Sequence, residues 1–200
     1  MGYFPFYIDI KDKICLVVGG GTVALRKVEK LLLFNPKITV VSPEIHREIT
    51  NLPNVTVIKR KFKDSDINNA FMVITATDDN ALNSHIFELC TAKNILVNTV
   101  DDRDKCGFIF PALIKNDSVT IGISTSGKCP IYSRYLREKI EKSYDKDFKI
   151  ADKLGEYRLM IKDKISTEAQ RKALLQQILD IYIDNENPDE KEVLKIIEES

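Results

Sequence analysis

Three consecutive glycines follow a short apolar run near the start of the chain, in the order Val17-Val18-Gly19-Gly20-Gly21-Thr22-Val23-Ala24. The G-x-G-x-x-A spacing gives each small residue a physical role. Gly19 permits a tight turn, Gly21 lets the backbone approach a diphosphate, and Ala24 lets a helix pack closely on the sheet. A helix predicted over residues 22–34 would direct unpaired N–H groups at that diphosphate. The pattern favours dinucleotide binding at Gly19, Gly20 and Gly21 over an ordinary tight turn.

The end of the next predicted strand, 38–41, bears on the choice of dinucleotide. An acidic residue there usually binds the adenosine ribose of NAD, but this chain has Ser42, Pro43 and Glu44. Ser42 can hydrogen-bond a ribose hydroxyl, and Glu44 is close by. No arginine stands at position 42 or 43 to receive a 2′-phosphate. We expect NAD, with NADP as the alternative that these residues do not exclude.

A pair of carboxylates, Asp101 and Asp102, follows another apolar strand. Ligands of open α/β sheets bind beyond the carboxyl ends of the strands, so Asp101 is expected on the functional edge, where it could act as a general base. The alternative role for an aspartate here is to cap a helix or close a turn. From the sequence alone, that role for Asp102 is as well supported as a catalytic role for Asp101. Thr77 ends a second strand and is expected to touch the ribose or the nicotinamide.

A third candidate site is the loop from Ser124 to Pro130, which precedes a predicted helix over residues 131–143. Its hydroxyls, free N–H groups and lysine resemble an anion nest without the Walker spacing, and the candidate ligand-binding residues are Ser124, Thr125, Ser126, Gly127 and Lys128. Arg134 and Arg137 on the helix could each pair with a carboxylate of a polycarboxylate substrate. The alternative is a solvated helix face on which Arg137 pairs with Glu141.

Elements that could position these residues alternate along the first half of the chain. Short β-branched runs at residues 14–18, 38–41, 55–58, 71–76 and 95–97 are separated by helical or turn-forming sequence, including a helix expected over 80–93 that Asp78 and Asp79 could cap. Such alternation predicts an α/β fold with a Rossmann-like, doubly wound parallel sheet.

The second half of the chain has a different pattern. A hairpin is expected from 112–114 and 119–123 with a turn at 115–117, followed by the helix at 131–143 and by packed helices from 148 with turns near Ser166 and Pro188. We expect three domains, namely an NAD-binding domain at 1–111, a small αβ module for dimerisation and substrate binding at 112–146, and a C-terminal helical domain at 147–200. A hairpin with one helix has little core of its own, so this module is the expected dimer surface.

Composition limits the classes of partner. The 200 residues carry 30 basic and 30 acidic side chains, a balance that gives no indication of nucleic-acid or membrane binding. No apolar run reaches a membrane span and the N-terminus lacks signal-like features, so we expect a cytoplasmic protein. Cys15 and Cys90 are expected in the core, whereas Cys106 and Cys129 lie in loops. His46 and His85 stand in no ligand cluster, so no metal site is expected.

Taken together, five segments resemble the precorrin-2 dehydrogenase family, which also supplies the N-terminal part of siroheme synthases. They are Tyr3-Phe4-Pro5-Phe6-Tyr7-Ile8-Asp9-Ile10, the glycine segment continued to Lys27, Thr75-Ala76-Thr77-Asp78-Asp79, Asn98-Thr99-Val100-Asp101 and Gly107-Phe108-Ile109-Phe110-Pro111-Ala112. The resemblance covers roughly the first 145 residues in matching order, which is more specific than one glycine motif.

The resemblance implies a homodimer that oxidises precorrin-2 to sirohydrochlorin with NAD, on the way to sirohaem or related tetrapyrroles. It further implies that Asp101 is the acid/base residue, that Thr22, Val23, Pro43 and Glu44 line the cofactor, and that the loop from Ser124 to Pro130 borders the tetrapyrrole. Some members also insert ferrous iron. The loop departs from the family's serine and glycine pattern at Thr125, Ser126 and Lys128, and the tail after residue 145 matches no motif.

Two classes of function therefore remain open. The first is a precorrin-2 dehydrogenase, with or without iron insertion. The second is a non-catalytic dinucleotide-sensing module, which the glycine loop alone would permit. Asp101 beside a basic, hydroxyl-lined loop favours the enzyme.

Overall fold

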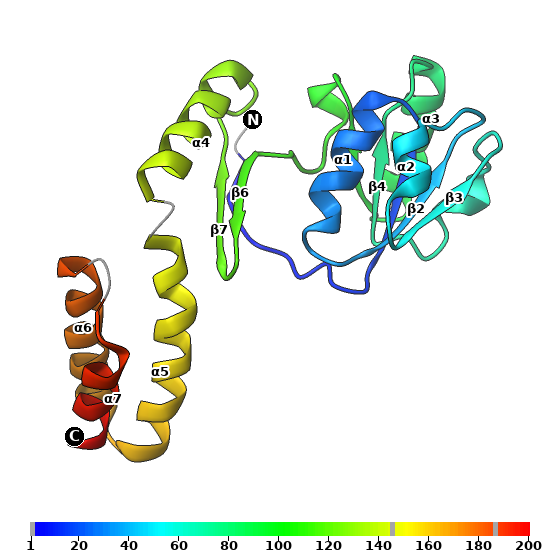
Figure 1. The fold of residues 1–200 in the computed structure, drawn as a ribbon. Coiled ribbons are helices and arrows are strands. Elements are labelled where there is room, and N and C mark those ends of the chain that lie inside the picture. The colour runs from blue at the N-terminus through cyan, green and yellow to red at the C-terminus, as the bar shows by residue number, and fades with distance from the viewer. Residues whose placement is uncertain (1–2, 145–146, 186–187) are drawn as a thin grey trace. The chain divides into compact units, whose positions relative to one another are not determined.

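The computed structural model describes residues 3–144, 147–185 and 188–200. The chain forms two compact units, Met1–Phe110 and Pro111–Ser200, each described here by itself (Figure 1). Among the described helices, none combines the length and the apolar character needed to cross a membrane. The boundary between the units falls next to the expected one, and the further division of the second unit at residue 146 stays a prediction.

A parallel sheet forms the centre of the first unit. Its strands lie side by side in the order β3-β2-β1-β4-β5, and all neighbouring pairs are parallel. The strand bounds are β1 Ile14–Val18, β2 Lys37–Val41, β3 Val55–Ile58, β4 Met72–Thr75 and β5 Leu96–Thr99. The order reverses between β2 and β4 on either side of β1, which is the topological switch point where such sheets bind ligands. The predicted Rossmann-like parallel sheet is thus confirmed.

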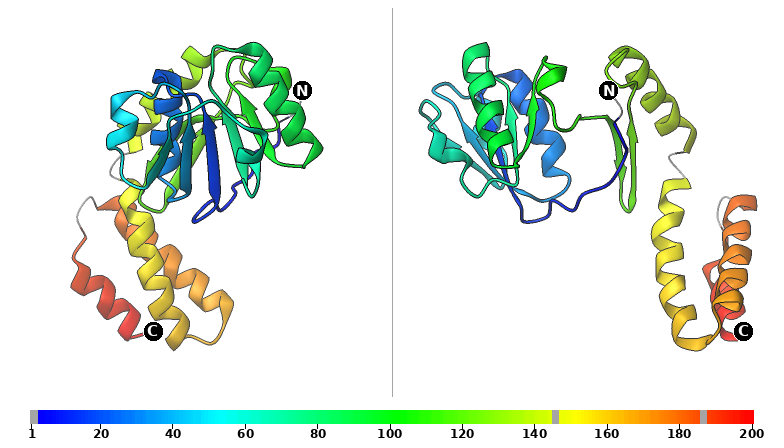
Figure 2. Two further views of the ribbon diagram at one scale, coloured as in Figure 1. Left: turned by 90° about the vertical axis from the view of Figure 1, so that its right-hand side faces the viewer. Right: turned by 180° about the vertical axis from the view of Figure 1, so that it is seen from behind.

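Helices cover both faces of this sheet, as Figures 1 and 2 show. One face packs against α1, Thr22–Leu32, and α2, Arg47–Asn51, and the other against α3, Asn80–Ala92, and the 3-10 helix η1, Asp64–Ile67. Because helices cover both faces, side chains on both sides of each strand are buried. This explains why the strands are nearly continuous apolar runs. Cys15 and Cys90 are fully buried in these two layers, as predicted.

Helix ends follow local chemistry. The first helix ends at Leu32 and not at the predicted residue 34, because Asn35 adopts the left-handed conformation with φ 53° and Pro36 follows it. The third helix begins as predicted, since the Asp79 carboxylate accepts a hydrogen bond from the Leu82 N–H at 3.0 Å.

The second unit begins with an antiparallel hairpin of β6, Ala112–Asn116, and β7, Val119–Ile123. The predicted turn at 115–117 is too early, because Lys115 and Asn116 pair with Thr120 and Val119 and the left-handed residue is Asp117, with φ 43°. Helix α4, Pro130–Tyr144, contacts this hairpin. Proline suits the first position of the helix because it has no backbone N–H, and an N–H at that position would find no acceptor within the helix.

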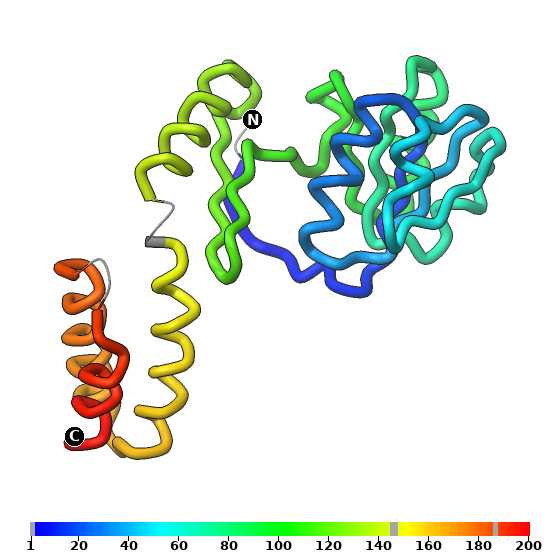
Figure 3. Tube along the Cα trace, in the orientation of Figure 1, coloured from blue at the N-terminus to red at the C-terminus, as the bar shows by residue number. Residues whose placement is uncertain are grey.

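Three helices complete the unit, namely α5, Ile150–Lys164, α6, Glu168–Asp184, and α7, Glu190–Glu198, with η3, Asp147–Lys149, before them. Their chain path is clearest in the tube view (Figure 3), where α5 and α6 run alongside each other. They share an apolar core that includes Tyr157, Ile161, Ile178 and Val193. The predicted break near Ser166 is confirmed, since α5 ends at Lys164 and α6 begins at Glu168. The predicted turn near Pro188 adjoins residues 186 and 187, which lie outside the described residues, and α7 begins after it at Glu190.

Candidate functional site

The turn between β1 and α1 brings the backbone of three strand ends together. Gly19 has φ +115°, and a Cβ placed on it would lie 2.1 Å from the Ala76 carbonyl oxygen. A Cβ on Gly20 would lie 2.1 Å from the Glu44 carbonyl oxygen. Any side chain at either position would therefore displace backbone, which explains why the sequence has glycine at both.

The start of α1 suits an anion. Its N-cap is Gly21, which supplies no side-chain cap, and the first turn contains no acidic residue. A Cβ on Gly21 would meet nothing within 4 Å. The first N–H groups of the helix and the adjoining backbone thus present an open approach to a diphosphate, as the glycine spacing predicts.

A cavity of about 840 Å³ lies against this turn. All nine residues predicted to bind the cofactor line it, namely Gly19, Gly20, Gly21, Thr22, Val23, Ser42, Pro43, Glu44 and Thr77. They come from the carboxyl ends of β1, β2 and β4, at the switch point of the sheet. The cavity is large enough for a nucleotide-sized ligand. That these residues bind the cofactor stays a prediction, but the structure gathers them around one space.

Sequence reasoning missed part of this lining. His46, Lys61 and Phe62 border the cavity as well. Lys61 and Phe62 follow β3, so the rule that ligands bind beyond strand ends could have found them. The His46 imidazole accepts a hydrogen bond from the Glu48 N–H at 3.3 Å and so caps α2.

Thr77 is held in place by α3. Its hydroxyl donates to the Asn83 side-chain oxygen at 2.7 Å, and the Asn83 amide donates back to the Thr77 carbonyl at 2.9 Å. The Asp79 N–H donates to the same hydroxyl at 3.2 Å. The side chain thus reaches the cavity from a fixed position.

The two neighbouring aspartates after β5 differ in their surroundings. Asp101 is exposed, has φ 63°, and makes no side-chain hydrogen bond or salt bridge with the residues that the structure describes. Asp102 accepts a hydrogen bond from the Asp104 N–H at 3.2 Å and a salt bridge from Lys105 at 2.9 Å, which holds the pKa of its carboxyl below the usual range. Asp102 thus closes a turn, which is the alternative role considered for it above. Asp101 has a carboxylate that is unpaired among the described residues. Asp101 does not line the cavity.

Cys106 lies after these aspartates and contacts the residues at the end of β5. Its Sγ lies 3.2 Å from the Thr99 carbonyl oxygen and 3.1 Å from that of Asp102, and it accepts a hydrogen bond from the Asn98 amide. Burial raises the pKa of this thiol. Cys106 therefore fixes the loop after β5 and is not an activated nucleophile.

The loop before α4 differs from the expected anion nest. The N–H groups of Ser126, Lys128 and Cys129 donate to the Ser124 hydroxyl, the Thr125 carbonyl and the Thr125 hydroxyl. The expectation of free N–H groups is therefore wrong for these three, because the loop caps its own helix. Ser126 and Gly127 adopt left-handed conformations that make this closure possible.

The two arginines of α4 pair within their helix. Arg134 Nε lies 2.9 Å from Glu138, and Arg137 lies 2.7 Å from Glu141, the pairing weighed above as the alternative. Both pairs are at least partly exposed, so they contribute little to stability and can exchange partners. Carboxylate binding by these arginines stays a prediction.

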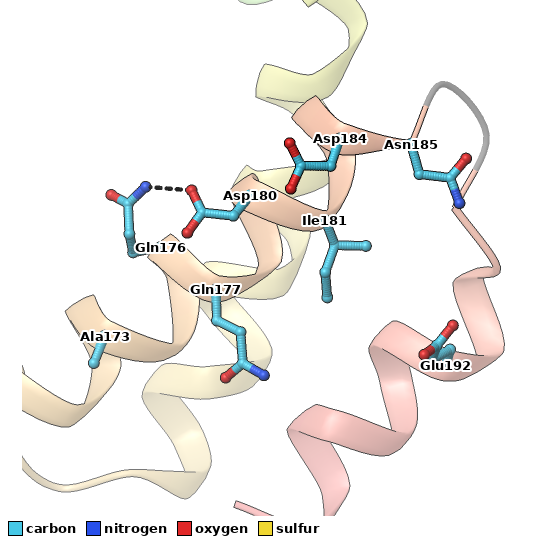
Figure 4. A pocket seen from close by; sticks show the side chains of 8 residues that line it. All are labelled: Ala173, Gln176, Gln177, Asp180, Ile181, Asp184, Asn185 and Glu192. Atoms are coloured by element: carbon cyan, nitrogen blue, oxygen red, sulfur yellow. Dashed lines mark hydrogen bonds between the residues drawn. The ribbon is translucent and has the colours of Figure 1, made fainter.

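A metal site and a second hollow are two further kinds of site that the described residues could offer. No group of three or more His, Cys, Asp or Glu residues in the described ranges is placed to hold a metal ion. His85 pairs with Asp64 at 2.9 Å. A second hollow on α6 and α7, drawn in Figure 4, has an amide and acidic lining without a single cation, which includes Gln176, Asp180, Asp184 and Glu192.

The fold and the cavity define a dinucleotide-binding protein of the Rossmann class. The sequence model of a family described as "Putative NAD(P)-binding" matches residues 6–112. Siroheme synthases of Thioalkalivibrio sulfidiphilus and Blochmanniella pennsylvanica are 39% and 41% identical over 184 and 182 residues. These alignments cover 90% and 89% of this chain and 38% of each relative.

A solved structure of the precorrin-2 dehydrogenase SirC superposes with a TM-score of 0.80 and 25% identity. The superposition covers 99% of this chain and 100% of that one. The chain belongs to the NAD(P)-binding family formed by precorrin-2 dehydrogenase and the N-terminal part of siroheme synthases. It spans 38% of the length of the two siroheme synthases.

Proposed function

We propose that this chain oxidises precorrin-2 to sirohydrochlorin with NAD, as a step of siroheme biosynthesis. The observation that carries the proposal is the cavity at the switch point, in which all nine predicted cofactor residues meet. The end-to-end superposition with SirC, a precorrin-2 dehydrogenase, supports this reaction over a sensing role. A dinucleotide fold alone would not decide between them.

The residues present fit a dinucleotide. Backbone space at Gly19 and Gly20 and the uncapped start of α1 suit the diphosphate, and Ser42 and Glu44 suit the ribose at the end of β2. When bound, the nicotinamide ring accepts the hydride that leaves the substrate. Thr77, whose side chain is held by Asn83, suits a role in orienting the ribose or the ring at the β4 end.

The choice of NAD over NADP rests on the residues after β2. Ser42 and Glu44 offer hydroxyl and carboxylate oxygens to a ribose, whereas a 2′-phosphate would meet the Glu44 carboxylate. Lys61 also lines this cavity, and its ammonium would favour a phosphate. We infer NAD because a neighbouring carboxylate repels the phosphate charge.

Oxidation removes a hydride and a proton from the macrocycle, so a base must reach the substrate. Asp101 suits this role because its carboxylate is exposed and unpaired among the described residues, just beyond the end of β5. Its left-handed backbone belongs to the turn closed by the Asp102 N–H and the Thr99 carbonyl at 3.4 Å, which carries Asp101 past the end of the strand. Asp102 cannot easily substitute, since it is bonded to Lys105 and the Asp104 N–H.

The αβ module supports dimerisation. Ile131, Tyr132 and Tyr135 on α4 are 83%, 52% and 54% exposed, and the two tyrosine rings stack with centroids 6.1 Å apart. An exposed apolar surface of this kind suits a second copy of the chain. Substrate binding by residues 124–128, Arg134 and Arg137 is proposed for the same module.

Anaerobic absorbance with purified protein, precorrin-2 and NAD tests the proposal. NADH formation together with sirohydrochlorin is the expected result. NAD binding without oxidation would instead support the sensing module. Adding ferrous iron afterwards, against a protein-free control, measures whether the chain also inserts the metal.

A further inference from the structure

Lys27 is a half-buried cation on α1 that has no carboxylate partner among the residues that the structure describes. Its Nζ lies 4.0 Å from the centre of the Phe110 ring. It makes no salt bridge with any residue in the described ranges, whereas Lys105 is paired with Asp102 on the loop after β5. A ring face attracts an ammonium, but it does not replace the lost water as a carboxylate would.

The charges around Lys27 come from two elements. Burial lowers its pKa to about 8, and repulsion by Lys30, one turn further along α1, acts in the same direction. Cys106 and Asp101, from the segment after β5, act in the opposite direction. Val100, the neighbour of Asp101, and Phe110 pack against the same core cluster as Leu25 and Val28 of α1, so the segment after β5 lies against the helix that carries Lys27. An arriving anion would stabilise the charged form of Lys27.

This arrangement is suited to a carboxylate from outside the chain. A desolvated ammonium without an anion is a costly group, and one charge-assisted hydrogen bond removes much of that cost. Precorrin-2, the substrate proposed above, carries acidic side chains around its ring. A carboxylate on Lys27 would fix the ring next to Asp101.

We propose that Lys27 is a positioning residue that binds a carboxylate of the tetrapyrrole beside Asp101, and so holds the reacting part of the ring within reach of that base. The inference rests on the proposed function. It assigns Lys27 to substrate affinity and orientation and leaves proton transfer to Asp101.

The lowered pKa of Lys27 predicts how substrate binding depends on pH. Lys27 is charged below its pKa of about 8 and neutral above it. Carboxylate binding favours the charged form, so affinity for the tetrapyrrole should fall as the pH rises through 8 and 9. A permanently charged arginine at this position should remove that fall.

The experiment compares Lys27→Met, Lys27→Arg and the control Arg26→Met, which alters the exposed neighbour on the same helix. Anaerobic equilibrium dialysis with sirohydrochlorin and without NAD measures binding separately from turnover. We expect Lys27→Met to weaken binding and raise KM for precorrin-2 by about 10- to 100-fold, the range for a bond to a charged group. Lys27→Arg should bind well, without the alkaline fall, and Arg26→Met should match the unmodified chain.

Unchanged affinity and KM in Lys27→Met would overturn the inference, as would an affinity that does not vary between pH 7 and 9.5 in the unmodified chain. Circular dichroism of each variant shows whether it folds. If Lys27→Met does not fold, the pH dependence of Lys27→Arg decides. The inference stands if its affinity for the tetrapyrrole no longer falls at alkaline pH, and it is overturned if the affinity still falls as in the unmodified chain. Failure of the proposed function gives a different result, because the unmodified chain would then not oxidise precorrin-2 at all.

Discussion

Replacing Asp101 by asparagine removes the proposed base and keeps the shape of the side chain. Asparagine tolerates the left-handed backbone at φ 63° as well as aspartate does. No hydrogen bond or salt bridge of the Asp101 side chain is lost within the described residues, so folding and NAD binding should persist. We expect kcat for precorrin-2 oxidation to fall by about 10²- to 10⁴-fold, which corresponds to roughly 3–5 kcal/mol of barrier.

Asp101→Ala separates the chemistry from the backbone. The kinetic loss should equal that of Asp101→Asn. Alanine in the left-handed region should in addition cost about 1–2 kcal/mol of unfolding free energy, or roughly 2–8 °C in Tm. Thermal unfolding followed by circular dichroism measures this difference.

Asp102→Asn is the matched control for both variants. It weakens the contact with Lys105 but leaves Asp101 in place, so kcat should remain within a few-fold of the unmodified chain. Single-turnover NADH absorbance under anaerobic conditions gives the rates. If Asp101→Asn retains more than about a tenth of the original kcat, Asp101 is not the base and the reasoning from its free carboxylate fails.

Three further predictions concern the cofactor turn, an ion pair and the thiols. Gly20→Ala should abolish NAD binding in calorimetry while the chain stays folded, since its Cβ would lie 2.1 Å from a backbone oxygen; normal affinity would contradict this packing. Arg60 lies 2.6 Å from Asp66 and lowers the pKa of that carboxyl. The ion pair therefore stabilises the fold at pH values above the carboxyl's unfolded pKa near 3.8, and this stabilisation is lost as the pH falls through the lower pKa of the folded state. The unfolding free energy of Asp66→Asn should therefore be lower than that of the unmodified chain at neutral pH and converge with it at low pH, and a gap that persists in acid would refute the ion-pair explanation. In native protein, a thiol reagent should label exposed Cys129 first and leave Cys15, whose pKa burial raises to about 12, unlabelled until unfolding; mass spectrometry identifies the order.

The fold of the first unit was predictable because its strands are buried on both faces and its turns carry glycine, asparagine or aspartate. The burial of Asn98 and Thr99 in β5 was not predicted, since both side chains are polar. Both are buried, and the segment after β5 folds back on the strand, where the Asn98 amide donates to the Phe108 carbonyl at 2.9 Å. Burial of that kind has no local sequence signal.

Part of the site was also predictable. The glycine turn and the rule that ligands bind beyond strand ends gave Ser42 and Thr77, which line the cavity. Lys27 was not singled out as a site residue, because a lysine on an amphipathic helix is usually solvated and only the folded chain shows Phe110 beneath it. The self-capped loop at 124–130 was misjudged for a related reason, since hydroxyl-rich sequence binds either a ligand or its own backbone.

The most direct test of the central claim is the stoichiometry of the reaction. Anaerobic spectra recorded with this chain, precorrin-2 and excess NAD should show one NADH formed for each sirohydrochlorin, with no turnover when NAD is omitted. Sirohydrochlorin formed at the same rate without NAD, or NAD bound without any sirohydrochlorin, would contradict the assignment of this chain as a precorrin-2 dehydrogenase.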